Sequence, residues 1–107
     1  MRFSELSKAS QGMISLCREI NFGLVMDIDV VNGEPRATSS TRKRTYIRLD
    51  RPEEATTKAE PYDFTLCAQQ EQFIRRIQAL GNGRIASLEV RDGRPANISI
   101  EEVVPML

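Results

Sequence analysis

The sequence predicts an α+β fold in which two tandem αββ repeats, each a helix followed by a β-hairpin, form a two-layer domain with a small antiparallel sheet. The first observation is a repeat, because Ile14 to Ser39 align without a gap on Ile74 to Ser99, sixty positions later. The second is that each copy contains apolar residues at helical spacing. The third is that each copy continues into two alternating stretches around a glycine turn. We therefore expect both copies to fold alike.

We expect a single domain over residues 1–107, since this length is that of one ordinary domain. The first repeat is predicted to span residues 4–50 and the second residues 64–102. Residues 51–63 lie between them and contain prolines, threonines and alternating charges without apolar periodicity. This composition predicts a linker or long loop.

The first predicted helix begins at about Ser4 or Ser7 and ends at Ile20. Its apolar residues recur at steps of three and four and therefore share one face. They are Leu6, Ala9, Met13, Leu16, Cys17 and Ile20. Asn21 is expected to cap the carboxyl end, and Gly23 lets the chain turn into the next strand.

The second predicted helix carries a matching apolar stripe, with Ile74 at its flank. The stripe consists of Leu66, Phe73, Ile77 and Leu80. Thr65 is the expected N-cap, because a threonine oxygen can accept a hydrogen bond from a free backbone N–H of the first turn. The sequence Gly-Asn-Gly at residues 81–83 is expected to end this helix.

Each helix is followed by a predicted hairpin with a two-residue turn, Asn32-Gly33 in the first copy and Asp92-Gly93 in the second. A type I′ turn needs positive φ at both central positions, and these residue pairs adopt it readily. A strict two-residue turn places Asp29 opposite Arg36 as a cross-strand charge pair.

Strand alternation predicts which residues of the central strands face the core. In the first copy these are Leu24, Met26, Ile28 and Val30, and in the second Ala86, Leu88 and Val90. Pro35 and Pro95 follow the turns, and we expect their strands to lie at sheet edges, because proline donates no ladder hydrogen bond.

The second hairpin also predicts a candidate protein interface. Ile85, Ile98 and Ile100 fall on the face opposite Leu88 and Val90, unless a bulge shifts the register. Either the sheet is then covered on both sides or its outer face is an interface. We favour the interface, formed with a protein partner or with a second copy of this chain.

The only charge cluster that stands out follows the first turn. Its candidate contact residues are Arg36, Arg42, Lys43, Arg44, Tyr46 and Arg48. In a nucleic-acid-binding protein the basic side chains would contact phosphates, Tyr46 would stack or donate a hydrogen bond, and the Asn32-Gly33 tip would approach a groove. The same residues also suit an acidic protein partner, or form a solvated basic loop.

Composition limits the other function classes. Lysine and arginine number 15, as do aspartate and glutamate, so the formal net charge is zero and no global field draws the chain to nucleic acid or anionic lipid. Arginine outnumbers lysine twelve to three, which favours planar contacts to phosphate or carboxylate. The first twenty residues contain no continuous apolar stretch, so we expect neither a signal peptide nor a membrane span, and a cytoplasmic location.

We predict no catalytic, cofactor-binding or metal-binding residues, and no small-molecule substrate. The chain has no histidine, and Cys17 and Cys67 lie on separate predicted helices without zinc-type spacing. Asp27 and Asp29 are two apart on one strand, but nothing in the sequence supplies a third ligand, so we interpret them as solvated strand residues.

Both copies resemble the YezD-like family of very small, uncharacterised bacterial proteins. The residues that carry the resemblance are Phe22-Gly23, Asn32-Gly33 and Lys43 to Leu49 in the first copy, and Asn82-Gly83 with Asp92-Gly93 in the second. The second copy lacks the basic tail and ends in Glu101-Glu102. The resemblance implies the repeated helix-plus-hairpin unit and a bacterial source, and it implies no chemistry.

The sequence therefore predicts a small, non-catalytic interaction or regulatory protein. It would bind a protein partner or a second copy of itself through a sheet edge or the outer sheet face. The alternative is a nucleic-acid-binding protein that uses the hairpin arm Arg42-Lys43-Arg44.

Overall fold

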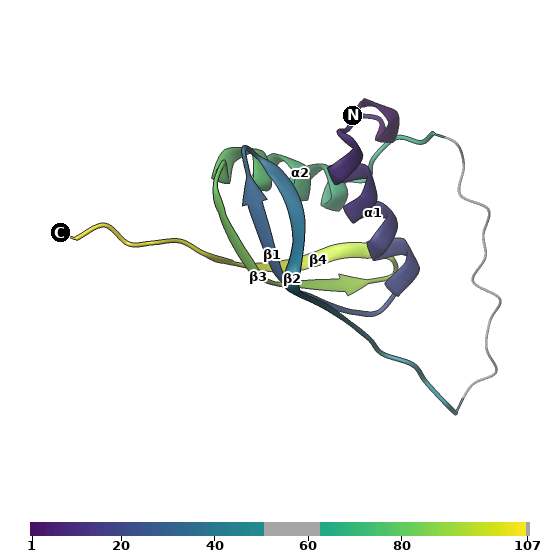
Figure 1. Ribbon diagram of the computed structural model, residues 1–107. Coiled ribbons are helices and arrows are strands. Elements are labelled where there is room, and N and C mark those ends of the chain that lie inside the picture. Colours follow the sequence, from purple (N-terminus) through teal and green to yellow (C-terminus); the bar gives the residue numbers. More distant parts are fainter. Residues whose placement is uncertain (51–62, 107) are drawn as a thin grey trace.

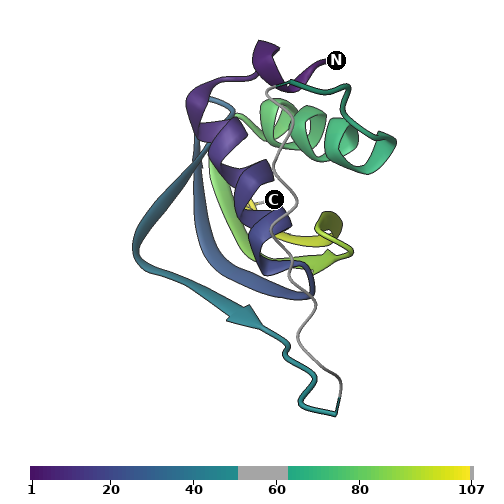
Figure 2. The same cartoon turned by 90° about the vertical axis from the view of Figure 1, so that its right-hand side faces the viewer.

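Four strands form one antiparallel sheet, and two α-helices lie on one of its faces (Figures 1 and 2). The computed structural model describes residues 1–50 and 63–106. The elements in chain order are the 3₁₀-helix η1 (Phe3–Glu5), α1 (Lys8–Ile20), β1 (Gly23–Val31), β2 (Glu34–Thr45), α2 (Ala68–Leu80), β3 (Gly83–Arg91) and β4 (Arg94–Glu101). The order across the sheet is β2-β1-β3-β4. The predicted α+β class and antiparallel sheet are confirmed; the predicted linker lies, apart from Asp63, outside the described residues.

The hydrophobic core lies between the helices and the sheet. Its fully buried side chains come from both helices and both central strands: Ile14, Cys17, Val25, Ile28, Ile74, Ile77, Ile85 and Leu88. No other element that the structure describes covers the opposite face of the sheet (Figure 2). We call this second face the open face.

Helix α1 starts at the later of its two predicted positions, because Ser7 is its N-cap. The Ser7 Oγ accepts a hydrogen bond from the Ser10 N–H at 3.2 Å, which satisfies one donor of the first turn. Asn21 ends the helix with a φ of 63°, a left-handed value that asparagine tolerates better than most residues.

Helix α2 starts after Cys67, not after Thr65 as predicted. The Cys67 N–H donates to the side-chain Oε1 of Gln70 at 3.0 Å, so a glutamine inside the first turn closes this helix end. Thr65 instead pairs with Arg2 in an isolated antiparallel bridge. The prediction of Thr65 as N-cap is therefore wrong.

Both predicted type I′ turns are confirmed. The φ angles are 51° and 75° at Asn32 and Gly33, and 51° and 72° at Asp92 and Gly93. These are the positive values that the turn type requires. The cross-strand pairing of Asp29 with Arg36 is confirmed as well.

Each hairpin turn packs against the end of the helix that precedes the other hairpin. The Gly33 N–H donates to the carbonyl oxygen of Gly81 at the end of α2, at 2.7 Å. The Gly93 N–H donates to the carbonyl oxygen of Asn21 at the end of α1, at 2.9 Å. The first half of the chain is thus fastened to the second by two equivalent contacts.

The predicted strand faces are partly wrong, because the alternation of side chains is interrupted in both central strands. Val25 and Ile28 are three residues apart, yet both are fully buried. Between them Asp27 has a φ of 60°, and the register with β2 shifts at this point. Leu24 and Met26, which were expected in the core, are partly exposed on the open face. A bulge of this kind moves side chains to the other face of a sheet.

A bulge in β3 also overturns the expected outer-face interface. Ile85 has no exposed surface, so it cannot contact a partner on the outside. Ile98 lies opposite Leu88 and Ile100 opposite Ile85, and cross-strand neighbours share a face. All three predicted interface isoleucines therefore face the helix layer, and Ile98 packs against the core.

The proline prediction is confirmed, since Pro35 lies in β2 and Pro95 in β4, the two edge strands. Pro35 lies opposite Val30 and Pro95 opposite Val90. Both prolines are buried, so their rings contribute to the core while the missing N–H leaves the sheet ladder intact.

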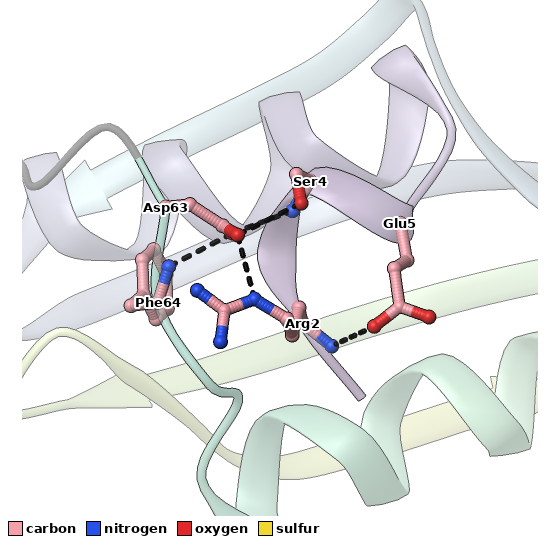
Figure 3. Close-up of polar contacts among 5 residues, drawn as sticks. All are labelled: Arg2, Ser4, Glu5, Asp63 and Phe64. Carbon is pink, nitrogen blue, oxygen red and sulfur yellow. Dashed lines mark hydrogen bonds and ion pairs between the residues drawn. The ribbon is translucent and has the colours of Figure 1, made fainter.

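The first residues of the chain are held against the segment that leads into α2 (Figure 3). The Asp63 carboxylate accepts hydrogen bonds from the Arg2 Nε at 2.7 Å and from the Ser4 N–H at 2.9 Å. These bonds hold the pKa of Asp63 well below its ordinary value, and the bond from Arg2 has the largest effect. The Phe3 and Phe64 rings stack with their centroids 4.9 Å apart. We call this contact the N-terminal clasp.

Candidate functional site

The predicted basic arm is part of strand β2, and its three residues do not point the same way. Arg42 and Arg44 lie opposite partly exposed apolar residues of β1 and project from the open face. Lys43 projects from the other face, where its Nζ lies 3.2 Å from Glu19 Oε1 of α1. Strand alternation thus separates Lys43 from the two arginines.

Arg36 belongs to a different part of the open face. Arg36 of β2 lies opposite Asp29 of β1. On the other side of β1, Asp29 lies opposite Arg84 of β3, and Arg84 lies opposite Glu101 of β4. This row crosses all four strands with alternating charge, so its charges compensate each other. Arg36 is therefore part of an internally balanced row and does not extend the pair formed by Arg42 and Arg44.

An irregular segment of β2, residues 38–41, separates Arg36 from Arg42. These four residues lie opposite the single bulged residue Asp27 of β1. The Thr41 Oγ1 donates to the Asp27 carbonyl oxygen at 2.5 Å, and the Thr38 N–H donates to the Thr41 Oγ1 at 2.8 Å. Because of the extra residues, Arg42 lies opposite Met26 and so beside the middle of β1.

Asp27 was expected to be a solvated strand residue, but it has a specific partner. Its Oδ1 accepts a hydrogen bond from the Arg84 Nη2 at 2.6 Å. This bond, together with the charge of Asp27, raises the pKa of Arg84 above its ordinary value. The side chains remain 38% and 46% exposed, so we interpret the pair as a surface ion pair of the open face.

Arg42 and Arg44 lie opposite Met26 and Leu24 of β1, so neither has an acidic residue opposite it, whereas Arg36 lies opposite Asp29. Among the residues that the structure describes, no carboxylate oxygen lies within 4.0 Å of either guanidinium group. Both side chains are exposed. By contrast, Arg48, predicted as a further contact, forms two hydrogen bonds to the Asp50 carboxylate at 2.7 and 3.1 Å.

Two aromatic side chains adjoin this arginine pair. The Tyr46 N–H donates to the Phe22 carbonyl oxygen at 2.8 Å, which continues the β1–β2 ladder past the end of both strands. Tyr46 is two residues beyond Arg44 and therefore projects from the same face. Tyr46 is 55% exposed and Phe22 42%, so both rings have surface free for contact.

We call Phe22, Arg42, Arg44 and Tyr46 the arginine–aromatic corner. The sequence pointed to Arg42, Arg44 and Tyr46 but missed Phe22. In the register expected from the sequence, a strict two-residue turn places Arg42 opposite Gly23. Phe22 and Tyr46 would then be three residues away from lying opposite each other. Only the irregular segment 38–41, which has no simple sequence signature, brings the two aromatic residues together.

In the part of the chain that the structure describes, no segment pairs with the outer edge of strand β2. Since Tyr46 donates its N–H toward β1, the alternation of an antiparallel ladder directs the N–H groups of Lys43 and Thr45 away from the sheet. From Arg36 to Thr45 every side chain is exposed apart from Thr41, which is partly buried. This edge is open to pairing with another extended chain.

The Asn32-Gly33 tip, which the sequence predicts to approach a nucleic-acid groove, contacts the end of α2 instead. Besides the bond from Gly33 to α2, the Asn32 N–H donates to the Asn82 Oδ1 at 3.1 Å. The Cα of Gln78 lies 3.2 Å from where a Cβ on Gly33 would be. The tip is thus packed against the end of α2.

Other parts of the molecule are weaker candidates for a functional site. A groove between α2 and β4 is lined mainly by neutral residues: Gln69, Gln72, Phe73, Pro95, Asn97 and Ile98. Burial raises the pKa of the Cys17 thiol to about 12, so this cysteine is not a nucleophile at neutral pH. In the described part of the chain, no three histidine, cysteine or acidic residues come together as a metal site.

Within residues 1–50 and 63–106, none of the helices has the length and apolar character needed to cross a bilayer. No protein-family model matches this chain, and no curated protein or solved structure does. The resemblance to the YezD-like family stays a prediction from the sequence.

Proposed function

We propose that the chain is a non-catalytic interaction domain whose binding surface is the edge strand β2 together with the open face beside it. The observation that carries the proposal is the outer edge of β2, a strand of twelve residues with which no described residue pairs on that side, and whose side chains from Arg36 onward are exposed apart from Thr41. The N–H groups of Thr38 and Ser40 are bonded to threonine side chains of β2, whereas those of Lys43 and Thr45 are directed outward and can pair with another extended chain.

Charge favours a different partner over a second copy of the same edge. Two β2 strands that pair antiparallel around a twofold axis bring Arg36, Arg42, Lys43 and Arg44 of one chain close to the same residues of the other. Like charges on adjacent strands are destabilising. A protein partner that supplies an acidic, extended segment fits this edge better than a second copy does.

The nucleic-acid alternative is supported by one specific observation. The arginine–aromatic corner presents two arginines without a described carboxylate partner beside two exposed rings. Phosphates suit the arginines, and bases suit the rings. This alternative uses the open face, in place of the hairpin tip suggested by the sequence.

A photo-crosslinking residue placed in β2 tests the proposal. We expect Ser39→p-benzoylphenylalanine to give an adduct in the source cell, because Ser39 is an exposed residue of the free edge. Ala79→p-benzoylphenylalanine is the matched control on the exposed side of α2. Mass spectrometry and nuclease digestion distinguish a partner protein, a second copy and nucleic acid. Equal adducts from both positions, or none from position 39, would contradict the proposal.

We further propose that the chain consists of two tandem αββ repeats. Both helices, both central strands and both turns begin sixty residues apart, as in α1 (Lys8–Ile20) and α2 (Ala68–Leu80). The central pairing supports this too, since Gly23 lies opposite Val90 and Val30 opposite Gly83. Both cysteines are free, which suits the expected cytoplasmic location.

A further inference from the structure

We infer that the arginine–aromatic corner binds single-stranded nucleic acid. This inference goes beyond the protein partner proposed for the edge of β2 and names the class of ligand that the open face takes. It depends on three observations: the spacing of the two arginines, the position of the two aromatic rings, and the ion pairs that the acidic residues of the open face form outside the corner.

The two arginines form a short track for a phosphate backbone. Arg42 and Arg44 are two positions apart on one strand, so their Cα atoms lie about 7 Å apart along it. Both side chains leave the same face, and neither has a carboxylate partner among the described residues. A guanidinium group offers a planar set of donors that matches phosphate oxygens.

The rings of Phe22 and Tyr46 lie at the end of this track, where the ladder continues by the bond between their backbones. Both retain about half of their surface for contact, at 42% and 55% exposure. Bases stack on exposed aromatic rings with little regard to sequence, provided that they are not already stacked in a duplex. The corner therefore offers sites for backbone and base next to each other, at one end of the β1–β2 pairing.

The acidic residues of the open face do not cancel this positive corner. Asp27 is bound to Arg84, and the Glu89 Oε1 lies 2.5 Å from the Arg91 Nη2. Asp29 lies between Arg36 and Arg84. Because the corner itself contains no acidic residue, a local positive potential at Arg42 and Arg44 is compatible with a net charge of zero.

The shape of the molecule favours a single strand over a duplex. Reading a duplex requires a helix, an arm, a turn or a two-stranded ribbon that enters a groove, and β1 and β2 belong to a four-stranded sheet instead of a two-stranded ribbon. Both hairpin turns are fixed against helix ends by the bonds from Gly33 to Gly81 and from Gly93 to Asn21. The corner itself is the surface of a sheet, on which single-stranded bases can lie flat.

The test is a fluorescence-anisotropy titration of the full chain with a labelled ten-nucleotide oligothymidylate, at several salt concentrations. A duplex of ten base pairs and poly-glutamate serve as competing probes. We expect the single strand to bind more tightly than either. Two neutralised phosphates predict a slope of about −1.4 for the logarithm of the binding constant against the logarithm of the salt concentration.

Four variants locate the site. The double variant Arg42→Gln/Arg44→Gln should weaken binding about tenfold or more and bring the salt slope close to zero. Tyr46→Ala should weaken binding about fivefold or more, whereas Tyr46→Phe keeps the ring and should bind as the parent does. Arg94→Gln is the matched control, because Arg94 is an exposed arginine at the other edge of the same sheet. It should change binding less than twofold.

Three results overturn the inference: no binding of oligothymidylate at low salt, equal loss in the Arg94→Gln control, or binding of poly-glutamate at least as tight as that of the oligonucleotide. The last result assigns the corner to an acidic protein. If the crosslinker at position 39 then still captures a protein, the proposed function stands while this inference fails. If neither probe nor crosslinker finds a partner, both are wrong.

Discussion

Substitution of Gly23 by alanine provides the sharpest test of the β1–β2 junction that positions the arginine–aromatic corner. A Cβ atom on Gly23 would lie 1.9 Å from the carbonyl oxygen of Arg44 and 2.9 Å from the side chain of Ile20. The first of these atoms belongs to the backbone of β2 and cannot rotate away. The strand must therefore move by about 1 Å, more than a close-packed interior absorbs without loss.

The expected cost follows from this displacement. Overpacking of a well-packed site destabilises by about 1–3 kcal/mol, and loss of a ladder hydrogen bond near the junction adds about 1 kcal/mol. Alanine also restricts the unfolded chain, which offsets about 0.4–1 kcal/mol. We expect Gly23→Ala to lower the free energy of unfolding by about 2 kcal/mol, which corresponds to a fall in Tm of roughly 8–16 °C for a domain of this size.

Gly12→Ala is the matched control, because nothing lies within 4 Å of a Cβ at this position in α1. Alanine there should raise the free energy of unfolding by about 0.5–1 kcal/mol, since glycine is a poor helix former. Urea unfolding followed by circular dichroism measures both variants. If Gly23→Ala unfolds within about 0.5 kcal/mol of the parent, the close approach of β1 and β2 does not constrain the fold and the reasoning fails.

Three further predictions concern the clasp, the thiols and the core. Because the pKa of Asp63 is lowered from 3.8, the clasp stabilises the fold above that pH, and this stability is lost as the pH falls further. In urea unfolding from pH 7 downward, the free energy of unfolding should fall more below pH 3.8 for the parent than for Asp63→Asn. Parallel curves for the two proteins would contradict this. In native protein, a thiol-reactive chromophore should modify Cys67, which is partly exposed, and reach Cys17 only on unfolding; rapid reaction of both thiols would refute the burial of Cys17. Ile85→Ala should lower the free energy of unfolding by about 2–5 kcal/mol in the same urea assay, whereas a residue at an outer interface would show almost no effect.

Features that depend on neighbouring residues could be predicted from the sequence. The two type I′ turns follow from Asn-Gly and Asp-Gly pairs, and the edge position of β2 and β4 follows from the prolines after those turns. Each of these features depends on the intrinsic conformational limits of one or two residues. Such limits hold in any context, so the sequence alone was sufficient.

The strand faces could not be predicted, because they depend on bulges. Asp27 adopts a positive φ although it is not a glycine, and its carbonyl oxygen is held by Thr41, fourteen residues away. A single extra residue reverses the faces of everything on one side of it. This is why Leu24 and Met26 were expected in the core and Ile85 on the surface.

The candidate site was predicted in composition but not in arrangement. The run of basic residues was evident, but alternation directs Lys43 to Glu19, and a short local pair neutralises Arg48. The N-terminal clasp was not predicted at all, since Arg2 and Asp63 are sixty-one positions apart and neither forms part of a periodic pattern. Contacts of this range depend on the completed fold.

The exchange of contacts between hairpin turns and helix ends has a consequence for how the molecule opens. The turn at Gly33 satisfies the end of α2, and the turn at Gly93 satisfies the end of α1, so each half supplies a bond that the other half lacks. Unravelling of one hairpin releases the far helix as well as its own. We therefore expect amide hydrogen exchange in α1 and α2 to report one shared opening event with a single free energy, and two separate opening free energies would contradict this coupling.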